Sequence, residues 1–226
     1  MTPTRLFALL LLPLAIPAAA VAQSADSYFI TVFGSGSNPL RAHRTHTFAT
    51  FTHVHETPAG PVVANDTISW MPAALRIRSL ALRPELGVNL TQEQTFRWIE
   101  SKGIRTSIWG PFEIKPERYA AYLERKAELE SGDVRYRAIG GFTKDAAVSN
   151  CGQSFSRAGI NGDRFLQPTP FPGEQGTSEL VKRAVRAAAA EGRTLVERPE
   201  LRPAVVTDPY PLTPREPGER ISRFRR

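Results

Sequence analysis

The sequence predicts an α+β fold, with a small, mainly antiparallel sheet flanked by two to four helices and an extended C-terminal tail. Three observations indicate it. Short runs of aromatic and β-branched residues recur along the chain and end at Gly or Pro, as strands do. Segments with helical periodicity and capping signals lie among them. The last 34 residues contain six prolines, which disfavour regular structure.

The first part of the domain is expected to form strands. Four are predicted, at residues 28–34, 45–54, 66–70 and 76–82. The first three are rich in Phe, Ile, Val, Thr and Trp, and the fourth has mostly alternating leucine and isoleucine. Pro58 and Gly60 predict a turn over residues 57–60, between the second and third strands.

The next segment alternates between helix and strand. Thr91 and Gln94 have the spacing of a capping box, which predicts a helix that stops at Gly103. Pro116 suits the first position of a second helix, which is expected to run to about residue 131. Two further strands are predicted, at 105–109 and 134–139.

The chain divides into four parts. Residues 1–22 read as a signal peptide, 28–160 as the α+β domain, and 161–192 as a loop and a C-terminal helix. That helix is expected to be capped by Thr177 or Ser178 and to end at Gly192. The proline- and arginine-rich segment 193–226 is expected to be a poorly ordered tail that adds little to the core.

The signal peptide predicts export to the periplasm or the medium. Arg5 precedes an apolar stretch that prolines interrupt, and Ala20-Val21-Ala22 has the small-residue pattern of a cleavage site. The mature chain would begin near Gln23, with no integral membrane segment after cleavage. The 226 residues, 41% hydrophobic and 23% charged, suit one soluble domain with tails. The net charge of +7 predicts attraction to anionic surfaces.

Cys151 is the one cysteine, so a disulfide framework and a multi-cysteine zinc site are excluded. It follows a predicted strand at a place where a helix can begin, and a helix N-terminus stabilises a thiolate. Cys151 is therefore a candidate nucleophile. The alternative is a buried structural residue, because free cysteines are often buried.

His46 is the candidate base, because an imidazole at the start of a strand can reach a thiol on a neighbouring helix. A hydroxyl of Ser69 or Thr67, or the Asp66 carboxylate, would then orient the ring. The alternative for His46 is an exposed strand histidine without a catalytic role.

Two further histidines, His53 and His55, share one face of the second predicted strand. A two-histidine metal site is compatible with this spacing. The only carboxylate next to them in sequence is Glu56, whose position does not argue for a third ligand. The sequence therefore assigns neither a metal nor a cofactor.

The order His46, then Thr67 or Ser69, then Cys151 resembles the circularly permuted, NlpC-like branch of the papain-fold hydrolases, over about residues 28–160. The resemblance implies a Cys–His hydrolase acting on amide bonds. The sequence His46-Thr47-Phe48-Ala49-Thr50-Phe51, with Trp109-Gly110-Pro111-Phe112 and Asn150-Cys151, is also similar to a family of exported bacterial proteins with which no activity is associated.

Two functions follow from the sequence. The first is an exported cysteine hydrolase acting on cell-wall peptides or lipids, with Cys151 and His46 as its dyad. The second is a non-catalytic exported binding or structural domain in which Cys151 is buried. In either case the expected partner is a cell-wall peptide or another anionic envelope component, and no specific nucleic-acid binding is predicted.

Overall fold

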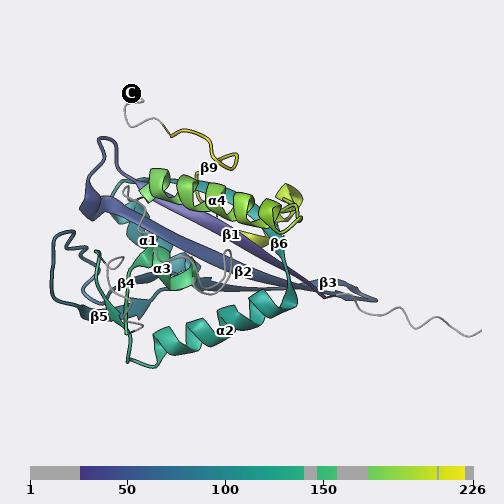
Figure 1. Cartoon of the computed structure of the whole chain (residues 1–226), viewed down its shortest axis with the longest axis horizontal. Coiled ribbons are helices and arrows are strands. Elements are labelled where there is room, and N and C mark those ends of the chain that lie inside the picture. The colour runs from purple at the N-terminus through teal and green to yellow at the C-terminus, as the bar shows by residue number, and fades with distance from the viewer. Residues whose placement is uncertain (1–25, 140–146, 157–172, 208, 222–226) are drawn as a thin grey trace, which may run out of the picture.

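The computed structural model describes residues 26–139, 147–156, 173–207 and 209–221. The chain forms two small, mainly antiparallel sheets with helices around them, which confirms the α+β class (Figure 1). The predicted signal peptide, residues 1–22, lies outside the described residues. Among the helices that are described, none has the length and apolar character needed to cross a membrane.

The larger sheet has five strands in the order β3-β2-β1-β6-β9. Their bounds are β1 (Asp26–Gly36), β2 (Thr45–Thr57), β3 (Gly60–Ile68), β6 (Arg105–Ile114) and β9 (Leu212–Pro214). All neighbours are antiparallel except β6 and β9. In the β1–β2 pair Asp26 lies opposite His55, and Tyr28 lies opposite His53.

The smaller sheet has the order β4-β5-β7-β8. Its strands are β4 (Trp70–Pro72), β5 (Glu85–Asn89), β7 (Arg135–Tyr136) and β8 (Val148–Ser149). The strand predicted at 76–82 is wrong, because this stretch is a loop and β5 pairs with β4 instead. Leu80 and Leu82 are both 84% exposed, so the apolar alternation there has no buried face to support it.

Five α-helices lie within the described residues. They are α1 (Gln92–Ser101), α2 (Pro116–Glu130), α3 (Cys151–Ser156), α4 (Gly173–Ala190) and the single turn α5 (Arg202–Val205); two short 3₁₀ turns span Ala42–Arg44 and Pro199–Leu201. The capping box of Thr91 and Gln94 forms as predicted, and Pro116 opens α2. Helix α4 begins at Gly173, four residues before the predicted cap Thr177.

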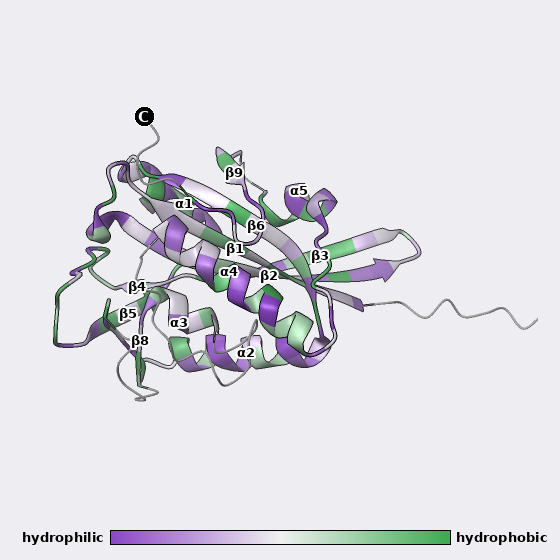
Figure 2. Cartoon of the chain, turned by 45° about the horizontal axis from the view of Figure 1, so that its top comes forward, coloured by the Kyte–Doolittle hydropathy of each residue, from purple (hydrophilic) through white to green (hydrophobic). Residues whose placement is uncertain are grey.

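The larger sheet carries a separate core on each face. On one face β1 and β2 pack against α2, α3 and α4, and this core includes Ile30, Phe51, Tyr122, Phe155 and Val181. On the other face the same strands pack against α1, and that core includes Phe33, Phe48, Phe96, Ile99 and Val205. Figure 2 shows both hydrophilic and hydrophobic residues along α4, as expected for a helix with one buried side.

Within its described residues, 193–207 and 209–221, the C-terminal segment is largely extended, and it contributes to the core although it was expected to add little to it. Strand β9 extends the larger sheet beside β6. Val205 and Ile221 are buried, one in each core. The Arg202 guanidinium donates to the Gly110 carbonyl. The prolines leave the strand pairing of β9 intact because β9 is an edge strand.

Candidate functional site

His46, the predicted base, is buried near the start of β2. Its Nε2 lies 2.8 Å from the Ser69 hydroxyl oxygen. The ring stacks on Phe48, with 5.6 Å between centroids, and meets the edge of Trp98 at 5.8 Å. These neighbours belong to the face of the sheet that α1 covers. The structure therefore brings together His46 and Ser69, two of the residues singled out in the sequence.

A chain of hydroxyl groups continues from this pair. Thr95 Oγ1 lies 2.7 Å from both the Ser69 hydroxyl and the Thr91 carbonyl oxygen. The Thr95 hydroxyl is the donor toward both of these oxygens. Ser69 Oγ is thus hydrogen-bonded to both Thr95 Oγ1 and His46 Nε2, and the buried Nδ1 of His46 has no hydrogen-bond partner among the described residues. Burial lowers the pKa of His46 to about 3, so the imidazole is neutral.

The hydroxyl of Thr67, the other one predicted to orient His46, bonds to a different side chain. Its Oγ1 is 3.0 Å from Thr50 Oγ1, and Gln92 Nε2 donates to that same Thr50 oxygen at 2.8 Å. Thr67 is thus part of a separate hydrogen-bond group on β2 and β3. The carboxylate of Asp66 forms an ion pair with Lys126, with 3.3 Å between Oδ1 and Nζ. Of the three candidates, only Ser69 bonds to His46.

Cys151 is the first residue of α3, as predicted for a candidate nucleophile. Asn150 caps this short helix by accepting from the backbone N–H of Gln153 at 2.8 Å. The cysteine is half-buried. Burial raises the pKa of its thiol, an effect that the backbone N–H groups of Thr47, Gly152 and Cys151 itself oppose. The thiol is therefore protonated at neutral pH.

Cys151 and His46 do not form a hydrogen-bonded pair. The Nε2 of His46 is bonded to Ser69, and its Nδ1 has no partner among the described residues. The two side chains also belong to different surroundings. His46 packs with Phe48 on the α1 face, whereas α3 contributes Phe155 to the core on the opposite face. The alternation of side chains along β2 separates them.

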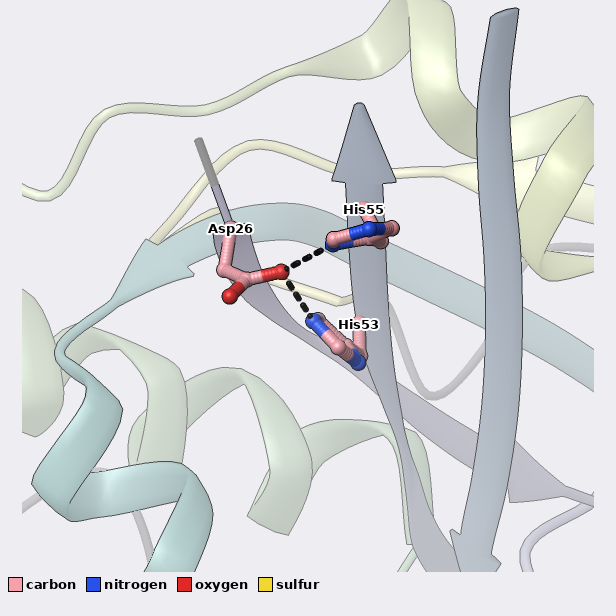
Figure 3. A group of neighbouring side chains, drawn as sticks. All are labelled: Asp26, His53 and His55. Carbon is pink, nitrogen blue, oxygen red and sulfur yellow. Dashed lines mark hydrogen bonds and ion pairs between the residues drawn. The ribbon is translucent and has the colours of Figure 1, made fainter. Parts of the chain in front are cut away.

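A second group of polar side chains lies where β1 begins (Figure 3). His53 Nε2 and His55 Nδ1 lie 2.9 Å and 2.7 Å from the same oxygen, Oδ1 of Asp26. The hydrogen bonds from His55 and then His53 lower the pKa of Asp26. The β1–β2 register produces the group, because Asp26 pairs with His55 and His53 follows two residues away on the same face.

Sequence reasoning identified the two histidines of this group but missed Asp26. The signal is long-range: Asp26 and His53 are separated by 27 positions. Finding it would have required the pairing of the two strands in their observed register, continued beyond the predicted bounds to Asp26 and His55. The three side chains are partly exposed, with 41% for Asp26, 30% for His53 and 43% for His55.

An open pocket lies between β6, the first turn of α2 and the end of α4. Its volume is about 600 Å³, with the solvent at its mouth included. The residues that line it are apolar at the floor (Ile30, Phe112, Ile114, Val181, Ala184, Leu195) and charged at the rim (Glu113, Lys115, Arg118, Glu191, Arg193). Phe112 lines the pocket and also belongs to the core on this face of the sheet.

Two of the cations at the rim, Lys115 and Arg118, act on the Glu191 carboxylate only through their charge. Arg193 donates to Glu191, and its hydrogen bonds and charge lower the pKa of that carboxyl, with smaller effects from Arg118 and Lys115. Within the described residues, no ion pair involves Lys115 or Arg118. An anionic group at the mouth of the pocket would interact with both Lys115 and Arg118.

Comparison of the chain with protein-family models, with curated proteins and with solved structures finds no match.

Proposed function

We propose that the protein is a non-catalytic exported domain that binds a small amphipathic anion, of the kind found among envelope lipids. The observation that carries this proposal is the pocket beside α4, which has an apolar floor and, at its rim, two cations that form no ion pair within the described residues, Lys115 and Arg118. Apolar lining with a few charged groups is typical of small-molecule sites. The net charge of +7 also favours an anionic ligand.

The alternative, a cysteine hydrolase with Cys151 and His46, is supported by the position of Cys151 at the start of α3. A thiol nucleophile also needs a base within hydrogen-bond reach. His46 is bonded to Ser69 and has a pKa lowered to about 3, and burial raises the pKa of the Cys151 thiol. Both shifts oppose formation of a thiolate–imidazolium pair. The binding function is therefore the better supported one.

A fatty-acid titration tests the binding function. Calorimetry with octanoate, decanoate and dodecanoate below their micelle concentrations should give saturable binding. The affinity should rise with chain length, because each buried CH₂ contributes about 0.8 kcal/mol until the floor is covered. Dodecanol, which has the chain without the charge, should bind more weakly. Absence of saturable binding by all three carboxylates would reject the proposal.

Two double variants locate the ligand. Lys115→Gln with Arg118→Gln removes these two cations and should weaken dodecanoate binding about twofold to 30-fold, since exposed charge pairs contribute about 0.2–1 kcal/mol each. Arg78→Gln with Arg83→Gln makes the same change of net charge on the exposed loop before β5. This control should bind as the unaltered protein does. Equal weakening by both would show that only net charge matters and that the pocket is not the site.

A further inference from the structure

We infer that Asp26, His53 and His55 form a binding site for a divalent transition-metal ion such as Zn²⁺. The three side chains offer two imidazole nitrogens and one carboxylate oxygen, all within 4.8 Å of one another. They come from two adjacent strands, β1 and β2, whose register fixes their relative positions. This site is separate from the proposed anion pocket, which none of the three residues lines.

The arrangement of the donor atoms suits a shared ion. Both imidazoles point to one carboxylate oxygen, so their ring nitrogens and that oxygen converge on a small volume (Figure 3). Ligands about 2.1 Å from a metal lie about 3.0 Å apart at right angles and about 3.4 Å apart in a tetrahedron. The N–O distances of 2.9 Å and 2.7 Å therefore need to open by only a few tenths of an ångström. The metal would replace the hydrogens now shared with Asp26.

The donor set selects the class of ion. Mg²⁺ and Ca²⁺ prefer oxygen ligands, whereas imidazole suits Zn²⁺, Cu²⁺, Ni²⁺ and Fe²⁺. Two nitrogens and one carboxylate leave at least one coordination position for water. The partial exposure of all three side chains gives an ion access from solvent.

Neighbouring rings hold one of the ligands in place. The His53 ring stacks on Tyr28, with 4.8 Å between centroids and 12° between planes. Tyr119, from the first turn of α2, stands 5.9 Å from the same imidazole and 4.8 Å from Tyr28. A ligand whose rotamer is fixed by packing loses little entropy when it binds a metal. His53 is thus preorganised for binding.

Calorimetry on the exported protein, purified without a polyhistidine tag and treated with chelator, tests the site. One Zn²⁺ should bind per chain, and Mg²⁺ or Ca²⁺ in excess should not compete. His53→Ala and His55→Ala should each weaken Zn²⁺ binding by at least about 30-fold, as expected when a direct ligand is lost. His43→Ala, which removes an exposed histidine outside the site, should leave the affinity within twofold.

Asp26→Asn keeps a hydrogen-bond acceptor for both histidines but removes the carboxylate charge. Loss of metal binding by this variant can therefore be distinguished from loss caused by unfolding. It should retain the circular dichroism of the unaltered protein and bind Zn²⁺ at least about tenfold more weakly. Bound Co²⁺ should show the visible absorption of a nitrogen- and oxygen-ligated ion, and His55→Ala should abolish it. Failure of the unaltered protein to bind Zn²⁺, or equal losses from His43→Ala and His53→Ala, would overturn the inference.

Discussion

Gly34 of β1 lies directly against Thr177 of α4: a Cβ added to this glycine would be 2.5 Å from Thr177 Oγ1. The same Thr177 hydroxyl lies 3.0 Å from Thr47 Oγ1 and donates to the Gly173 carbonyl. The absence of a side chain at position 34 therefore lets the start of α4 sit on the sheet. This contact also places α4 along one wall of the proposed anion pocket, through Val181 and Ala184.

Gly34→Ala should destabilise the protein by about 1–3 kcal/mol, the usual cost of overpacking a tight contact. Gly36→Ala is a matched control two residues along the same strand, since its added Cβ would have no atom closer than Leu40 Cδ1 at 3.7 Å. Urea unfolding followed by circular dichroism measures both. Equal losses in the two variants would mean that α4 does not pack on β1 as described.

The lowered pKa of His46 predicts a specific pH dependence of stability. The imidazole is neutral in the folded protein down to pH about 3, but it takes up a proton below its ordinary pKa of 6.5 when the chain unfolds. The unfolded state thus binds more protons between these values. The contribution of His46 to the free energy of unfolding should be complete above pH 6.5 and decrease as the pH falls, by at most about 1.4 kcal/mol per pH unit.

His46→Gln removes this titration, and comparing it with the unaltered protein cancels the effects of the carboxylates. The difference in unfolding free energy between the two proteins should shrink from pH 7 to pH 4.5. Ser69→Ala should lower stability by about 1–3 kcal/mol at pH 7, because it leaves the buried Nε2 of His46 without its hydrogen-bond partner. Parallel pH curves for His46→Gln and the unaltered protein would show that His46 is not buried and neutral.

Deletion of residues 193–226 should lower the melting temperature by at least about 5 °C. It removes β9 and the buried side chains of Val205 and Ile221, each contributing about 1–3 kcal/mol. A full deletion that melts like the intact chain would restore the view of this segment as a tail.

Local signals in the sequence predict local structure well. The hydroxyl of Thr91 and the amide of Gln94 define the start of α1, and Pro116 defines the start of α2, because each acts within one helical turn. Such signals fail where burial decides the outcome. The leucines at 80 and 82 alternate like a strand yet remain exposed, and Val205 and Ile221 are buried despite the surrounding prolines.

The candidate sites depend even more on contacts between distant residues. The placement of Cys151 at a helix start was predictable, since the capping residue Asn150 is its neighbour in the sequence. The pairing of His46 with Ser69 was one of several options, and strand geometry selected it over Thr67. Asp26 was not predictable from its surroundings in sequence, because only the β1–β2 register brings it to His53 and His55.

The separation of Cys151 from His46 is most directly tested by the rate at which a thiol reagent labels native Cys151 across pH, in the unaltered protein and in His46→Gln. Because burial raises the pKa of the thiol and His46 is bonded to Ser69, labelling should be slow near pH 7. It should accelerate only above the ordinary thiol pKa of about 8.5 and follow the same curve in both proteins. Rapid labelling at pH 7 that His46→Gln slows would contradict the account and favour the hydrolase.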